Sequence, residues 1–108
     1  MVKSQLNEVF AALADPTRRA MLADLARVPS LTAGQLAEPH SMTLPAISKH
    51  LAVLERAGLL TRTRRGRHQI CSLNPRPLRE AADWLSRHER FWTERVDALH
   101  DYLVKETP

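Results

Sequence analysis

The chain has 108 residues, 44% of them hydrophobic, and a formal net charge of +4 at pH 7. A chain of this length and composition folds as one ordinary globular domain with a modest core, which argues against two domains. No apolar run approaches the roughly 20 residues that a membrane span requires, and the first residues do not lead into a secretory signal. We therefore expect a cytoplasmic protein without a membrane partner. Its single Cys71, which cannot form an internal disulfide, agrees with a reducing compartment.

Apolar residues at helical spacing predict two helices in the first quarter of the chain. The first ends at Asp15, and the second has Asp15 as its N-cap and Pro16 at its first position, where a missing N–H breaks no hydrogen bond. The second helix is predicted to end at Val28. Arg18 and Arg19 lie in its first turn, where cations oppose the helix dipole. A phosphate bound nearby and simple exposure to solvent explain these two arginines equally well.

The fourth predicted helix, residues 43–57, has two different faces. It follows an extended link at residues 30–32 and a short third helix at residues 32–38. Thr43 is its predicted N-cap and Gly58 its C-terminal stop. The positions that repeat at intervals of four and three, and so face the core, are Ile47, Leu51 and Leu54. The opposite face is poor in bulk and can approach base edges closely; it carries Pro45, Ala46, Ser48, Lys49 and Ala52.

A basic hairpin is predicted directly after this helix. Residues 60–64 and 68–73 are two short strands, and Gly66 supplies the turn between them. The segment from Arg56 to Arg79 contains seven arginines and no Asp or Glu. A slender helix beside a cationic hairpin fits duplex DNA, with the helix in the major groove and the hairpin on the flanking phosphates. The alternative is that the arginines only solvate a surface, although scattered Lys and Glu would serve that purpose better.

A long helix is predicted over about residues 75–104. Its heptad seam is formed by Leu78, Ala82, Leu85, Glu89, Trp92, Val96, Leu99 and Leu103, with Trp84 and Phe91 on a neighbouring stripe. This is more apolar face than a small domain covers, so we expect self-association; the alternative is that the helix folds back over its own domain. From Glu80 onward seven acidic residues outnumber four basic ones. The basic excess, and with it any polyanionic partner, therefore belongs to the front three quarters of the chain.

The order of these segments and their sequence motifs resemble those of the ArsR/SmtB family of bacterial winged-helix repressors. The matching segments are residues 12–19, 36–38, 48–51, 54–59, 65–67 and 72–75. Each segment alone is a weak signal, but their joint order and spacing over about residues 10–103 is specific. The subgroup that lacks metal ligands and has an aromatic-rich last helix is the most similar.

The resemblance implies a mainly α-helical fold with a small β-hairpin wing, a winged helix-turn-helix that dimerises through its first and last helices. It also implies a homodimer that binds a palindromic operator in double-stranded DNA and represses transcription. One domain is expected over residues 1–108, with its core at about 4–73 and a dimerisation helix at about 75–104. Two recognition helices related by a two-fold axis would read half-sites about 10 base pairs, or a multiple, apart.

Carried over position by position, the resemblance assigns residues to two surfaces. DNA contact is expected from the recognition helix at residues 43–57, the wing at residues 62–68 and the start of the second helix, through Thr43, Pro45, Ala46, Ser48, Lys49, His50, Arg62, Arg64, Arg65, Arg67, His68, Arg18 and Arg19. Dimer contact is expected from Leu6, Phe10, Leu85, Trp92, Val96, Leu99 and Leu103.

Physical chemistry separates the roles within the DNA-binding set. Lys49 and the wing arginines are expected to bind phosphates, which gives affinity but little specificity. Ser48 can hydrogen-bond to a base edge, and Pro45 or Ala46 can touch a thymine methyl group. His50 fits equally well a contact with DNA and a packing role with a local hydrogen bond.

Two stretches depart from the family pattern. His40 and Ser41 stand where an apolar residue and a turn glycine are expected, and Ile70 and Cys71 replace an aromatic pair. These differences bear on the geometry of the turn, and they leave the charged wing and the seam unchanged.

A metal site and a catalytic site are not expected. Metal-sensing relatives carry an acid two residues before a His on the last helix, whereas here Ser86 precedes His88, and Leu103 stands where a ligand should follow His100. The third helix has no cysteine, and Cys71 is expected to be a buried hydrophobe, with an intermolecular disulfide as the alternative. No cofactor and no enzyme activity are predicted. Two alternatives stay open, a sensor that a metal or ligand releases from DNA and a winged-helix module that binds proteins; the sequence does not identify an effector.

Overall fold

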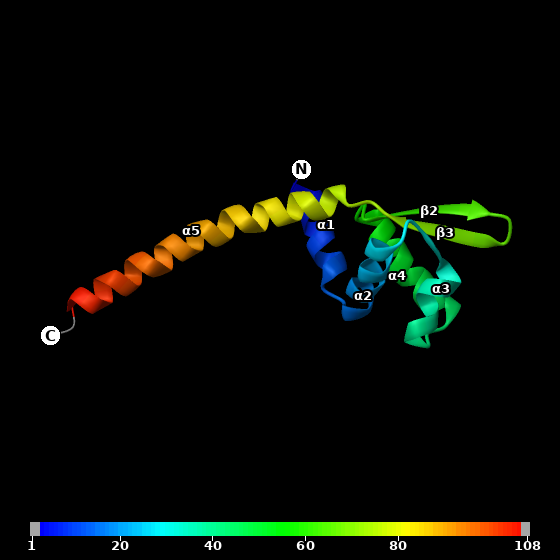
Figure 1. Ribbon diagram of the computed structural model, residues 1–108, viewed down its shortest axis with the longest axis horizontal. Helices are drawn as coiled ribbons and strands as arrows, with labels where there is room; N and C mark the ends of the chain where they lie inside the picture. The colour runs from blue at the N-terminus through cyan, green and yellow to red at the C-terminus, as the bar shows by residue number, and fades with distance from the viewer. Residues whose placement is uncertain (1–2, 107–108) are drawn as a thin grey trace.

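The computed structural model describes residues 3–106, in which a hairpin and a long helix project from a body of shorter helices (Figure 1). The elements in chain order are α1 (Lys3–Leu13), α2 (Pro16–Arg27), β1 (Leu31–Thr32), α3 (Ala33–Ala37), the 3₁₀ turn η1 (Glu38–His40), α4 (Leu44–Arg56), β2 (Leu60–Arg65), β3 (His68–Leu73) and α5 (Arg76–Glu106). The β2–β3 hairpin and α5 project from opposite ends of the body, so the molecule measures 72 × 29 × 23 Å. The predicted fold class, a mainly helical winged helix-turn-helix, is confirmed.

One hydrophobic core holds the first four helices and the sheet together. Both inward stripes predicted from helical spacing are buried, Met21, Leu22 and Leu25 on α2 and Ile47, Leu51 and Leu54 on α4. Val9 of α1 and Leu36 of α3 complete this core from the other sides. Because each helix contributes one apolar stripe, its opposite face is left to solvent.

The sheet has one strand more than the sequence analysis expected. The link at residues 30–32, which was predicted only to be extended, contains β1, and β1 pairs antiparallel with β3 to give the order β1-β3-β2. Leu31 lies opposite Cys71, which is completely buried. Burial raises the pKa of the Cys71 thiol above its ordinary value. The side chain is therefore a small core hydrophobe with little thiolate character, as expected.

Caps and positive-φ residues end the elements where the sequence predicts. Asp15 caps α2 by accepting a hydrogen bond from the backbone N–H of Arg18 at 3.0 Å. At the end of α4, the backbone N–H of Leu59 donates to the carbonyl of Leu54 at 3.0 Å, around Gly58 with φ +79°. This is the 6→1 bond of a glycine-terminated helix. In the hairpin, Gly66 (φ +60°) opens a two-residue turn in which a glycine at the first position matches the twist of the strands.

The third helix and the turn after it differ from the prediction. The helix is Ala33–Ala37, shorter than the predicted residues 32–38, and the chain then continues as η1, which contains Pro39. Proline is tolerated there because the first N–H groups of a helical turn need no internal partner. Ser41 follows with φ 50° in the left-handed region. The turn therefore keeps the backbone that the expected glycine would adopt, although serine occupies it at some cost in strain.

Only the first turns of α5 pack on the body. Ala81 is buried, and the ring of Trp84 meets Phe10 of α1 edge-on with 5.8 Å between ring centroids. His88 stacks on Trp84 at 3.9 Å, and the described side chains of residues 89–105 are all exposed. Folding back over its own domain therefore accounts for the start of the helix only. None of the helices in residues 3–106 combines the length and apolarity that crossing a bilayer needs.

Gly58, which has positive φ, and Gly34, which lies in a helix, test whether backbone conformation decides how a glycine affects stability. Gly58→Ala should lower the free energy of unfolding by about 1–2 kcal/mol, because a Cβ is strained at positive φ. Gly34→Ala should raise it by up to about 1 kcal/mol, because a Cβ on this helical residue meets only the Thr32 hydroxyl at 3.8 Å. Urea unfolding followed by circular dichroism measures both changes. Equal effects of the two substitutions would contradict the assignment.

Candidate nucleic-acid interface

The outward face of α4 is a narrow, uncharged-to-basic surface. With Ile47, Leu51 and Leu54 buried, the 3.6-residue period directs Pro45, Ser48 and Lys49 to solvent, and all three are exposed. Ala46 is half-buried, and Thr43 caps the helix by accepting a hydrogen bond from the backbone N–H of Ala46 at 3.3 Å. The predicted face is thus present as one strip along the first turns of α4.

A hollow of about 310 Å³ lies between this strip and the wing. α4 contributes Leu44 and Ser48 to its lining, while β3 and the turn before it contribute Arg67 and His68. The recognition-helix candidate and the hairpin therefore border one concave surface, although they are separate elements in the sequence.

His50 lies on a different side of α4, against α1 and α2. Its Nδ1 atom is 3.4 Å from Nη1 of Arg18 and 3.9 Å from Oδ2 of Asp15. The backbone N–H of Arg18 holds the pKa of Asp15 below its ordinary value, and the charges of His50 and Arg18 add to this effect against partial desolvation. Of the two roles left open by the sequence, the geometry favours packing with a local hydrogen bond.

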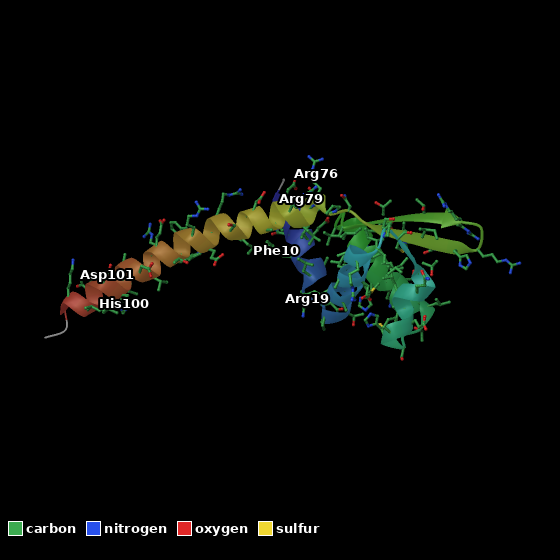
Figure 2. All side chains as sticks on the ribbon, viewed as in Figure 1. Phe10, Arg19, Arg76, Arg79, His100 and Asp101 are labelled. Atoms are coloured by element: carbon green, nitrogen blue, oxygen red, sulfur yellow. The ribbon has the colours of Figure 1, made fainter. Side chains whose placement is uncertain are left out.

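Arg18 and Arg19 donate hydrogen bonds to the C-terminal carbonyls of α1, a role that was not predicted from the sequence. Arg18 donates from Nε to the carbonyl of Ala12 at 2.7 Å and from Nη2 to that of Ala11 at 3.0 Å. Arg19 donates from Nη1 to the carbonyl of Leu13 at 2.7 Å; it lies where α1 meets α2 (Figure 2). The last carbonyls of a helix lack internal partners and carry partial negative charge. These bonds account for both cations without a phosphate.

Arg62 fastens the base of the wing to α4. Its Nη2 atom lies 3.0 Å from Oε1 of Glu55, its Nη1 atom donates to Oε1 of Gln69 at 3.3 Å, and only 20% of its side chain is exposed. Arg64, farther along β2, is exposed and donates from Nε to the carbonyl of Gly66 at 3.3 Å. Of these two predicted contacts, the geometry favours a structural role for Arg62 and leaves Arg64 accessible.

The tip of the wing carries the accessible charge. Arg65, Arg67 and His68 are exposed, and within residues 3–106 no carboxylate forms an ion pair with either arginine. Two unpaired guanidinium groups on either side of Gly66 suit a run of phosphates, which lie a few ångströms apart along each strand.

Known proteins are similar to this chain in both sequence and fold. A family model described as a helix-turn-helix domain matches residues 13–63. Transcriptional repressor SdpR of Bacillus subtilis is 39% identical over 80 residues, which cover 74% of this chain and 88% of that protein. HTH-type transcriptional regulator Rv2034 of Mycobacterium tuberculosis is 38% identical over 100 residues, covering 93% of this chain and 90% of that protein. A crystal structure of an ArsR family transcriptional regulator superimposes with a TM-score of 0.80 at 38% identity, covering 86% of this chain and 95% of that chain.

The chain belongs to the ArsR/SmtB family. It is a DNA-binding transcriptional regulator and not an enzyme, as the sequence analysis predicted. The match at residues 13–63 spans α2, α3, α4 and the start of β2, which are the elements that build the strip and the base of the wing.

The residues predicted to form an ArsR/SmtB dimer occupy two different environments. Leu6 and Phe10 of α1 are half-buried and pack against the core of their own protomer. The others lie on α5 and are each more than half exposed: Leu85, Trp92, Val96, Leu99 and Leu103. Within residues 3–106, no three His, Cys, Asp or Glu side chains of one protomer are grouped to hold a metal ion.

Sequence reasoning missed two residues of this surface. These are Leu44, which is 70% exposed at the first position of α4, and Gln69, which lines the hollow from β3. The available signal for Leu44 was its position four residues before Ser48, which places both on one flank of the helix.

Proposed function

We propose that this regulator is a homodimeric repressor that binds a palindromic operator without a metal cofactor. In this proposal one domain covers residues 1–108, with a core at about 4–73 and a dimerisation helix at about 75–104. The single observation that carries it is the exposed strip of α4 beside a wing tip with two unpaired arginines. Repression is the part inferred from similarity to SdpR, which is named a transcriptional repressor.

On DNA, α4 enters the major groove with its N-terminal turns toward the base edges. Ser48 donates to or accepts from a base, and Lys49 reaches a phosphate. The wing follows the flanking backbone, where Arg64, Arg65 and Arg67 bind phosphates and His68 lies beside them. Arg18, Arg19, His50 and Arg62 are engaged within the protein, so we assign them to holding the interface in shape and not to contact with DNA.

Dimerisation places two such surfaces on one face of the assembly. The apolar side chains of α5 beyond His88 are exposed in one protomer, and burying them against a second copy removes a large apolar area from water. Leu6 and Phe10 support the start of α5 and border the same interface. A two-fold axis then sets the spacing of the half-sites at about one helical turn of DNA or a multiple.

Wing charge gives the first prediction for this function. In the double variant Arg65→Gln/Arg67→Gln, the slope of log K against log salt should fall by roughly 3.6 per dimer, because each lost phosphate contact removes about 0.9. Fluorescence anisotropy on a duplex selected from a random pool by the wild-type protein measures this slope. Arg27→Gln is the matched control, since Arg27 lies on α2 and pairs with Asp24 at 2.7 Å. An unchanged slope in the double variant would remove the wing from the interface.

The α5 interface gives the second prediction. Leu99→Glu should yield monomers in analytical ultracentrifugation, because the dimer would bury an unpaired carboxylate at a cost of several kcal/mol. Its own protomer should stay folded, since Leu99 is 58% exposed there. Asp101→Lys changes a charge about 200° around the helix from Leu99, away from both the seam and the stripe of Trp84 and Phe91, and should remain dimeric. A dimeric Leu99→Glu protein would show that the interface lies elsewhere.

The absence of a metal cofactor is the third prediction. After dialysis against zinc and removal of unbound metal, elemental analysis should find far less than one zinc per protomer. The affinity for the selected duplex should be the same with zinc and with a chelator, because the five histidines do not supply three converging ligands. Stoichiometric zinc, or release of DNA by zinc, would support the metal-sensor alternative.

A further inference from the structure

Leu44 is the most exposed large apolar side chain in the described part of the chain, at 70%. The other large apolar residues that are exposed lie on α5, with the exception of Val28 at the end of α2. Among the described residues outside α5, Leu44 and Val28 are therefore the two exposed large apolar side chains, and Leu44 is much the more exposed. It occupies the first position of α4, directly after the Thr43 cap.

The position of Leu44 joins it to the proposed DNA-binding surface. It lies one helical turn before Ser48 on the flank of α4 that faces the wing, and it lines the same hollow as Arg67 and His68. In helix-turn-helix proteins the N-terminal residues of the recognition helix are those that reach base edges. On the opposite flank His50 is turned toward the body, so the wing-side flank is the accessible one.

Few polar side chains beside Leu44 can form hydrogen bonds that identify a purine base. Residues 43–49 contain no Arg, Asn or Gln, so Lys49 is the only side chain in this part of α4 that could form the bidentate hydrogen bonds that identify guanine, and none can form those that identify adenine. The Thr43 hydroxyl accepts from the helix backbone, which leaves Ser48 and Lys49, which we assign to a phosphate, as the polar groups of the strip. A further feature that distinguishes a base pair in the major groove is the C5-methyl group of thymine, which an apolar side chain can contact.

We propose that Leu44 determines specificity by contacting a thymine methyl group in each half-site. Its side chain is longer than those of Pro45 and Ala46, and Ala46 is half-buried, so Leu44 reaches farthest from the helix among these three apolar residues. This inference rests on the proposed function, because it assumes that α4 lies in the major groove.

Replacing thymine by uracil tests the contact, because it removes the methyl group and leaves every hydrogen-bonding group of the base in place. Each thymine of the selected duplex is replaced singly, and symmetric pairs are then replaced together. For the wild-type protein, we expect an effect at one symmetric pair of positions. Uracil should weaken binding by about fourfold when it replaces thymine in one half-site and by about fifteenfold when it replaces thymine in both, as expected for one buried methyl group per half-site.

The Leu44→Ala variant should bind the thymine duplex more weakly and lose its sensitivity to uracil at that position. Its salt slope should equal that of the wild type, because no phosphate contact is removed. Val28→Ala is the matched control, an exposed apolar residue outside the surface, and it should keep the full uracil effect. Thermal unfolding verifies that both variants are folded.

The outcomes separate this inference from the proposed function. Specific binding by the wild type that is indifferent to every uracil replacement overturns the role of Leu44 and leaves the repressor proposal intact. A uracil effect that persists unchanged in Leu44→Ala assigns the methyl group to another residue and overturns the inference as well. Failure of the wild type to select any duplex overturns the proposed function and this inference together.

Discussion

The burial of one stripe of α4 is the constraint on which the rest of the structure depends. Ile47, Leu51 and Leu54 are fixed in the core, so the rotation of the helix about its axis is fixed, and the opposite strip must face solvent. The ion pair between Glu55 and Arg62 then holds the wing to the same helix at 3.0 Å. Helix and hairpin are thereby presented as one surface, and neither would form it alone.

The arginines show how one residue type serves three purposes in a basic chain. Arg18 and Arg19 bind the carbonyls at the end of α1, Arg62 joins two elements, and Arg65 and Arg67 remain unpaired at the wing tip. Net charge therefore overstates the charge that can reach a polyanion. Binding to a polyanion depends on which arginines are accessible more than on how many there are. An arginine that already donates to a carbonyl or a carboxylate has fewer free donors and less freedom to move.

Local patterns predicted the helices well because capping and amphipathic spacing act over a few residues. The stripes of α2 and α4, the caps at Asp15 and Thr43, and the glycine stops all follow from such patterns. The strand β1 was missed because two residues carry no periodicity and its partner β3 lies about 40 residues away. The partners of Arg18 and Arg62, and the exposure of Leu44, depend on how helices pack, which sequence spacing alone does not encode. The strip of α4 and the wing were therefore found from the sequence, while the structure was needed to show which of the predicted residues are already engaged within the protein.

The far half of α5 extends from the body with its apolar side chains exposed, and pairing with a second copy would place two α4 strips on one side of the assembly. Hydroxyl-radical footprinting on a duplex selected by the protein would show whether two such surfaces bind the DNA together. We expect two patches of protected backbone, related by two-fold symmetry and centred about one helical turn apart or a multiple of it. A single protected patch, or protection without two-fold symmetry, would contradict this expectation.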